Sequence, residues 1–142
     1  MGAGVNMGQS TDAKIWFGFC WDEKDQEYYE NGLPECVLAH LKAQDSDIED
    51  EEDAERAIEK ILKKFDCELV HHCYCDGADM VGIAISASYE CASRGYPINL
   101  TTTGKITTGT IGDDWLEKLT AAAESVGWPM KPPSWWLASY WC

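Results

Sequence analysis

The chain has 142 residues, of which 45% are apolar and 25% are charged, and its formal net charge at pH 7 is −14. This length and composition predict one globular domain whose core is large enough to fold without disulfides or a metal ion. The longest apolar run, Ile15–Trp21, is far too short to span a bilayer, and no secretory signal begins the chain, so we expect no contact with a membrane. The negative charge argues against direct binding to nucleic acid or anionic lipid.

The first predicted element is an aromatic-rich strand. Residues 1–12 are small and polar and predict a flexible segment ahead of a single domain at 13–142. The strand predicted at 14–21 has apolar side chains on both faces, which indicates a central strand covered on two sides. Gly18 interrupts this strand and indicates that another segment of the chain passes close by.

Two helices are predicted after this strand, at 34–44 and 50–65. Acidic residues gather at the start of the second helix and lysines at its end, as the helix dipole favours. Its apolar residues recur at the i, i+3, i+4, i+7 spacing of a helix with one buried face: Ala54, Ala57, Ile58, Ile61, Leu62 and Phe65.

A hairpin is predicted next, because Asp76-Gly77 stands between the apolar runs 68–75 and 80–89. In the second run, small residues share one face, which indicates that either a closely packed helix or solvent lies against it: Gly82, Ala84, Ser86 and Ser88. Residues 98–110 are rich in Thr and Gly and predict a short edge strand or hairpin.

A helix at 113–126 and a strand at 134–141 complete the prediction. Thr110–Asp113 resembles a capping box, and Gly127 is a typical helix stop. The expected buried residues of the helix are Trp115, Leu116, Leu119, Ala122, Ala123 and Val126. Together the elements predict an α+β domain, with a mainly antiparallel sheet of about four strands and about three helices packed on it.

The seven cysteines are an odd number and include no CxxC pair, so free and mostly buried thiols are expected. His71, Cys73 and Cys75 would share one face of a strand, and imidazole and thiolate are zinc ligands, which makes a metal-binding protein one alternative. Same-face neighbours on a strand start about 6–7 Å apart, which is awkward for three ligands of one tetrahedral ion. The leading expectation is therefore no metal and no cofactor.

A thiol nucleophile would need a nearby imidazole and an orienting acid. Cys20, Cys73 and Cys91 can be combined freely with His40, His71 or His72, and no sequence resembling a known nucleophile motif surrounds them. A protein that is not an enzyme is therefore the favoured interpretation.

The most distinctive feature is an acidic stretch, because residues 22–59 hold 15 of the 25 acidic residues and three basic ones. Carboxylates on a helix can imitate the phosphates of nucleic acid and occupy the basic groove of a nucleic-acid-binding protein. The plain alternative is a solvated helix start that aids solubility. The candidate partner-binding residues are Asp45, Asp47, Glu49, Asp50, Glu51, Glu52, Asp53 and Glu55.

The C-terminal tail is unusually aromatic, with four of the seven tryptophans in Trp128–Trp141. Packing in the core is the favoured interpretation. A contact in a homo-oligomer, or an aromatic-lined pocket that sequesters a small molecule such as a nucleotide signal, is the alternative.

The two ends of the chain, Met7–Ala13 (MGQSTDA) and Trp136–Trp141 (WLASYW), resemble those of small tailed-bacteriophage proteins, and the central Val70–Cys73 is similar. The resemblance implies a phage origin and the cytoplasm of the infected bacterial host, and no site residues are carried over. Set against this resemblance, the acidic stretch Asp45–Glu55 is expected to be an insertion of this chain, and charge mimicry is not implied for the phage proteins themselves. We therefore expect a phage protein that binds a basic host protein, most concretely an acidic inhibitor of a host defence nucleoprotein such as a CRISPR effector or a restriction enzyme.

Overall fold

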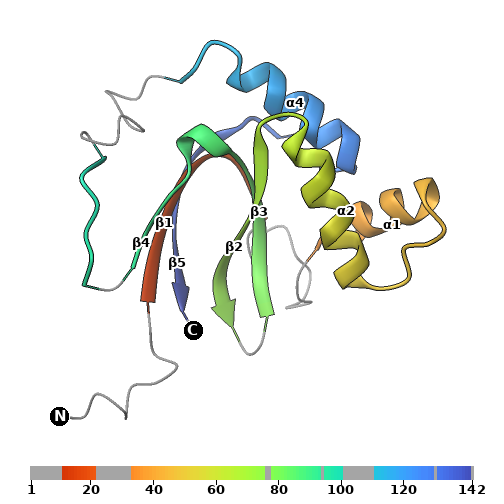
Figure 1. Ribbon diagram of the computed structural model, residues 1–142, viewed down its shortest axis with the longest axis horizontal. Coiled ribbons are helices and arrows are strands. Elements are labelled where there is room, and N and C mark those ends of the chain that lie inside the picture. The colour runs from red at the N-terminus through yellow and green to blue at the C-terminus, as the bar shows by residue number, and fades with distance from the viewer. Residues whose placement is uncertain are drawn as a thin grey trace.

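The computed structural model describes residues 11–21, 33–75, 78–93, 95–100, 111–129 and 131–141, with the backbone alone at 11, 73–75, 78–79 and 140–141. Within these residues, five strands form one antiparallel sheet and three α-helices pack against it (Figure 1). The α+β class predicted from the sequence is confirmed. None of the helices among these residues is both long enough and apolar enough to cross a membrane.

Strand β1 (Thr11–Cys20) is the centre of the sheet. Along one edge it pairs with β5 (Ser134–Trp141) over its length, from Thr11 opposite Trp141 to Gly18 opposite Ser134. Along the other edge it pairs with β3 (Ala78–Ile85) and then with β4 (Glu90–Ala92). The central position expected for this strand is confirmed, and the strand takes in the last two residues of the segment expected to be terminal; residues 1–10 lie outside the described residues.

The expected hairpin is formed by β2 (Cys67–Cys75) and β3, which pair antiparallel. The prediction of one strand at 80–89 is wrong, because β3 ends at Ile85 and a 3₁₀ turn, η2 (Ser86–Ser88), separates it from β4. The buried Ser88 hydroxyl donates to the Ile85 carbonyl at 2.7 Å and accepts from the Phe17 backbone N–H at 2.8 Å. The Ser88 side chain therefore supplies a hydrogen-bond acceptor for the Phe17 N–H of β1, at the point where η2 separates β3 from β4.

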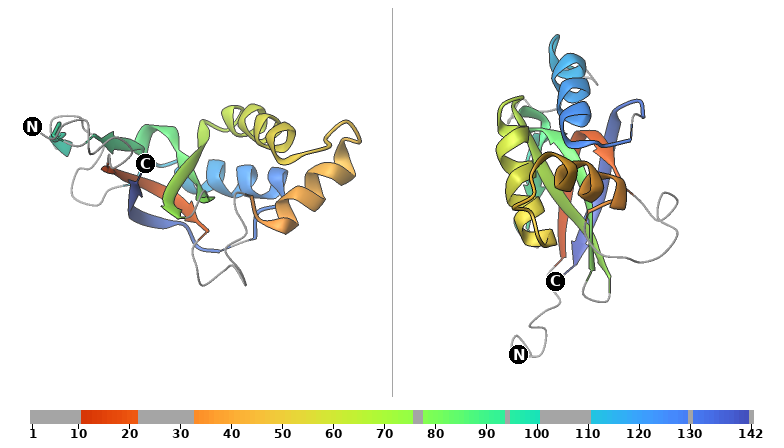
Figure 2. Two further views of the ribbon diagram at one scale, coloured as in Figure 1. Left: turned by 90° about the horizontal axis from the view of Figure 1, so that it is seen from below. Right: turned by 90° about the vertical axis from the view of Figure 1, so that its right-hand side faces the viewer.

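The helices of the described residues are α1 (Glu35–Gln44), α2 (Glu51–Lys63) and α4 (Trp115–Val126). Helices α2 and α4 lie against one face of the sheet, and α1 packs on these two helices (Figures 1 and 2). Ala54, Ile58 and Leu62 of α2 are buried there, as the helical spacing predicts. They join a core with side chains from the same face of β1 and β3, namely Phe17, Phe19, Val81, Ile83 and Ile85. Helix α2 is shorter than the predicted range 50–65, because it begins at Glu51 and ends at Lys63.

Helix α4 departs from its prediction at its beginning. It starts at Trp115 with Asp114 in the N-cap position, so Asp113 precedes the helix and cannot take the N3 role of the capping box expected at Thr110–Asp113; Thr110 itself lies outside the described residues. The side chain of Leu116 is 47% exposed rather than buried. The predicted end is confirmed, because Gly127 adopts the left-handed conformation (φ 75°) that closes a helix. Nearly all of the predicted strand or hairpin at 98–110 lies outside the described residues.

On the face of the sheet away from the helices, the β2–β3 hairpin folds over towards β5. The β2–β3 hairpin runs obliquely to β1 and β5 (Figure 2), and β2 lies close to β5. The enclosed side chains form a second cluster: Trp16, Cys20, Val70 and Ala84, with Tyr89, Trp136 and Ala138 packed against it. A Cβ on Gly82 would lie 3.1 Å from the Trp16 ring, so the small-residue face of β3 makes room for this tryptophan. The expectation of a helix or solvent on that face is wrong.

Candidate functional site

The eight predicted carboxylates lie together at one end of the fold, in the loop from α1 to α2 and the first turns of α2. We call this stretch, Asp45–Glu55, the acidic segment. It lies at the opposite end of the molecule from β4 (Figure 1), and its side chains are exposed or half-buried except at two apolar positions. Those two residues, Ile48 (8% exposed) and Ala54 (0%), anchor the segment to the core.

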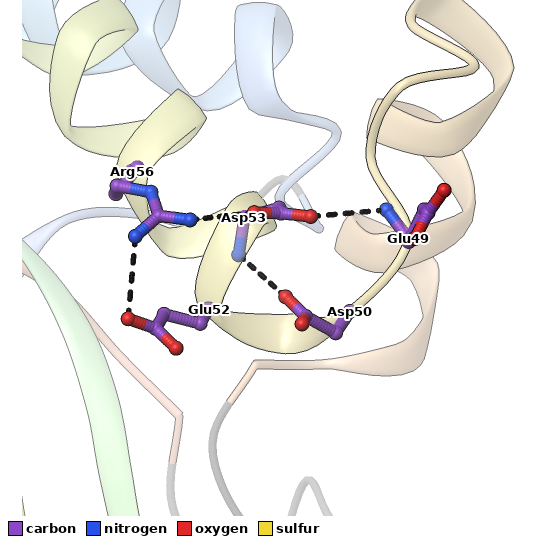
Figure 3. A network of polar contacts seen from close by, with 5 residues as sticks. All are labelled: Glu49, Asp50, Glu52, Asp53 and Arg56. Carbon is purple, nitrogen blue, oxygen red and sulfur yellow. Dashed lines mark hydrogen bonds and ion pairs between the residues drawn. The ribbon is translucent and has the colours of Figure 1, made fainter.

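Part of the negative charge caps helix α2. The Asp50 carboxylate accepts from the Asp53 backbone N–H at 2.9 Å, as an N-cap residue does, and the Asp53 carboxylate accepts from the Glu49 N–H at 3.3 Å (Figure 3). One turn earlier, the Asp45 carboxylate accepts from the Asp47 N–H at 2.9 Å. Each of these carboxylates accepts a hydrogen bond from a backbone N–H at a helix start or in a tight turn. Without the carboxylate, that N–H would hydrogen-bond to water.

Another part of the charge is paired with the one arginine of α2. Arg56 lies 3.2 Å from the Glu52 carboxylate and 2.6 Å from that of Asp53 (Figure 3). The hydrogen bond from Arg56 is the main cause that lowers the pKa of Asp53 below its ordinary value. The Glu52 side chain stays 78% exposed, so one of its oxygens remains available to a partner.

Two carboxylates reach other parts of the fold. The Glu51 carboxylate accepts from the backbone N–H of Leu33, just ahead of α1, at 2.8 Å. The Glu55 carboxylate lies 3.7 Å from His71 Nε2 on β2. These residues connect α2 to its neighbours and are poor candidates for binding a partner.

The structure therefore divides a set that the sequence treated as equivalent. Asp47 and Glu49 are exposed, and their carboxylates make no hydrogen bond or ion pair within the described residues. With Glu52 they are the members of the set best placed for an external contact. Sequence reasoning left out Glu59, which is exposed two helical turns after Glu52; the spacing of seven residues was the available signal. Beyond it, exposed lysines at 60, 63 and 64 end the negative surface.

The alternative metal site at His71, Cys73 and Cys75 is incomplete in what the structure describes. His71 faces α2 and Glu55, and the β2–β3 register shifts between His72 and Cys75, which interrupts the regular alternation of faces. The side chains of Cys73 and Cys75 lie outside the described residues. Among the residues that are described, no group of three His, Cys, Asp or Glu side chains could hold a metal ion.

The aromatic tail packs on both faces of the sheet. Trp128 contacts Trp21 (ring centroids 5.9 Å apart), and Trp135 contacts Phe17 (5.5 Å) on the helix-covered face. On the other face, Trp136 donates its indole N–H to the Gly18 carbonyl at 3.1 Å. These contacts confirm core packing for Trp128 and place Trp135 and Trp136, both half-buried, against the two clusters, whereas Leu137 is 76% exposed. The small-molecule pocket stays a prediction.

Among the cysteine–histidine combinations whose side chains the structure describes, it brings Cys20 and His72 together. Cys20 Sγ lies 3.3 Å from His72 Nε2, and both residues are buried. Cys67 is buried elsewhere, and burial raises the pKa of its thiol to about 12. Cys36 is exposed on α1. The four cysteines whose side chains the structure describes are free thiols, and of these Cys20 and Cys67 are buried, so burial, expected for most of the thiols, holds for half of these four.

Comparison with protein-family models, with curated proteins and with solved structures gave no significant match to this chain. The resemblance of its ends to phage proteins therefore stays a prediction. A function has to be argued from the geometry of the chain's own residues.

Proposed function

We propose that this chain is a binding protein that presents its acidic segment to a basic, nucleic-acid-binding protein and occupies the place of phosphate groups. The observation that carries the proposal is the set of exposed carboxylates at Asp47, Glu49 and Glu52, which lie at one end of the fold. Arg56, the nearest paired cation, lies on one side of this set and contacts only Glu52 of the three. A concentrated charge of one sign steers a partner of the opposite sign and fixes its orientation.

The local structure favours this use because it holds the charges in place before binding. The Asp50 cap, the Asp53 contacts and the buried Ile48 fix the loop against the start of α2. Glu52 and Glu59 lie two turns apart on this helix, about 10 Å along its axis. Ordered charges lose less conformational entropy on binding than charges on a flexible tail, so more of the electrostatic attraction is retained.

The target class rests on the resemblance to phage proteins. A phage protein that binds a basic groove without catalysis would act in the host cytoplasm, where nucleic-acid-handling defences such as CRISPR effectors and restriction enzymes operate. The protein would compete with the nucleic acid for the groove. It would therefore inhibit the nuclease in proportion to its concentration and would need no cofactor.

The test is inhibition of a purified restriction endonuclease and of a purified CRISPR effector by the chain and two charge-reversal variants. The first variant carries Asp47→Lys, Glu49→Lys and Glu52→Lys. The matched control carries Asp113→Lys, Glu117→Lys and Glu124→Lys, which make the same change in net charge at exposed positions in and before α4. We expect the first variant to lose inhibition by roughly tenfold or more and the control to keep it.

Salt dependence provides a second arm of the test. Binding through exposed carboxylates should weaken steeply as the salt concentration rises, because counterions screen the interaction. The proposal fails if neither class of nuclease is inhibited. It also fails if the two variants inhibit equally, or if inhibition is the same in low and high salt.

A further inference from the structure

Cys20 and His72 form a buried thiol–imidazole pair inside the curled sheet. Cys20 is the last residue of β1 and His72 lies on β2, 52 positions later, with 3.3 Å between Sγ and Nε2. Cys20 is 9% exposed and His72 is 1% exposed. The Trp16 ring, on the same face of β1, lies 5.5 Å from the His72 ring. The pair is therefore held by packing from two strands.

The other free thiols that the structure describes have different surroundings. Cys36 is exposed on α1. The Cys67 thiol donates to the Phe65 carbonyl at 3.3 Å, and burial raises its pKa to about 12, which suppresses the reactive thiolate. Cys91 on β4 neighbours Tyr89. Cys20 alone among these four has an imidazole nitrogen within hydrogen-bond distance, and an adjacent base is what activates a thiol as a nucleophile.

We propose that Cys20 is a site of covalent modification by small soft electrophiles, with His72 accepting the thiol proton. In the reaction with an alkyl iodide, the sulfur forms a bond to carbon, the carbon–iodine bond breaks and iodide leaves. The thiol proton moves to Nε2 of His72, so the atoms and charges balance. No oxidant or further reactant is needed.

The modification has a structural consequence, because the same pair helps to hold β2 over the inner face of the sheet. The Lys14 ammonium donates to the carbonyl of His71 at 2.8 Å, and Trp16 packs against His72. The β2–β3 register shifts directly after His72, where the ladder is already interrupted. Cys20 belongs to one buried cluster with Trp16 and Val70, so a group added to its sulfur crowds this packing. Modification therefore releases β2 and changes the environment of Trp16.

The test uses iodoacetamide on the native full-length chain, with the labelled positions identified by peptide mass spectrometry. Rates are normalised to those of the urea-unfolded chain, in which burial no longer differs. We expect Cys36 to react first, and Cys20 to react roughly tenfold or more faster than Cys67, the other buried thiol. Labelling of Cys20, and not of Cys36, should shift tryptophan fluorescence.

Two variants separate the role of His72 from accessibility. In His72→Gln the advantage of Cys20 over Cys67 should disappear, and in Cys20→Ser the fluorescence shift should be lost while Cys36 is still labelled. The proposal is overturned if Cys20 reacts no faster than Cys67 in the native chain. It is equally overturned if folded His72→Gln keeps the advantage, or if Cys20 is labelled without a change in fluorescence. Should His72→Gln fail to fold, the comparison with Cys67 and the Cys20→Ser chain decide alone. None of these outcomes depends on binding through the acidic segment.

Discussion

The carboxylate of Glu51, in the first turn of α2, accepts a hydrogen bond of 2.8 Å from the backbone N–H of Leu33, which precedes α1. Leu33 is buried and belongs to the core beneath the helices. By its sequence, Glu51 is one of the carboxylates of the acidic segment. In the structure it holds the backbone in place just ahead of α1. Negative charge in this protein has structural uses as well as the proposed external one.

Removing this contact should destabilise the fold. Glu51→Ala leaves the Leu33 N–H without its partner, and we expect the free energy of unfolding to fall by about 1 kcal/mol. Glu51→Gln keeps an accepting oxygen and should lose less. Urea denaturation followed by far-UV circular dichroism measures the difference. Glu49→Ala is the matched control, expected to change stability by less than about 0.5 kcal/mol; equal losses at 49 and 51 would contradict the assignment.

Gly18 is the position in β1 where a side chain is least tolerated. Its φ is 158°, and a Cβ there would overlap with the carbonyl oxygen of Ile83 on the neighbouring strand. We expect Gly18→Ala to lower the free energy of unfolding by about 3 kcal/mol. Gly95→Ala is the control, because Gly95 also has a positive φ (83°) but nothing within 4 Å of a Cβ. A similar loss in the two variants would show that backbone conformation, and not the approach of β3, sets the cost.

The elements that the sequence predicts well are those whose signals are local. Helix α2 combines an apolar stripe with acidic residues at its start and lysines at its end. The stop of α4 at Gly127 needs only the left-handed conformation of one residue. The break of the strand at Ser86–Ser88 has no such signal, because it depends on a hydroxyl that meets Phe17 from a distant strand. The small face of β3 has no local signal for its partner either, since Trp16 of β1 fills the space beside Gly82 only in the folded sheet.

The candidate site shows the same limit. The sequence locates all eight carboxylates in one segment, and the structure keeps them at one end of the fold. Which carboxylate meets which donor is decided by tertiary contacts: Glu51 reaches Leu33, and Glu55 reaches His71. The separation of Asp47 and Glu49 from these structural residues therefore could not be read from the sequence alone.

Lys118 should make stability depend on acid pH. Its ammonium lies 2.8 Å from Asp114 and 2.5 Å from Asp66, and the hydrogen bond from Lys118 is the main cause that lowers the pKa of Asp114. Because the folded value lies below the unfolded one, this stabilisation is present above about pH 4 and is lost as the pH falls through the lowered pKa. The groups are exposed, so the effect is small and is screened by salt.

The measurement for this pair is the unfolding midpoint temperature at about pH 5 and about pH 3 in low salt. Acidification should lower the midpoint more in the unaltered chain than in Lys118→Met, and the difference should narrow in high salt. Lys42→Met removes an exposed lysine of α1 that forms no ion pair within the described residues, and it should behave like the unaltered chain. The same pH dependence in both variants would exclude the pair as its source.

Ser88 ties the turn between β3 and β4 to β1, and its removal should be costly for its size. The residue is 0% exposed, and its hydroxyl serves the Phe17 N–H at 2.8 Å and the Ile85 carbonyl at 2.7 Å. Ser88→Ala leaves both backbone groups buried without that partner, so we expect the free energy of unfolding to fall by about 2 kcal/mol. Ser86→Ala, in the same 3₁₀ turn but partly exposed, should cost less than about 0.5 kcal/mol. Amide exchange at Phe17 gives a second measurement, because in Ser88→Ala this N–H should exchange faster relative to Phe19. Unchanged exchange together with unchanged stability would mean that the hydroxyl does not hold the strand in place.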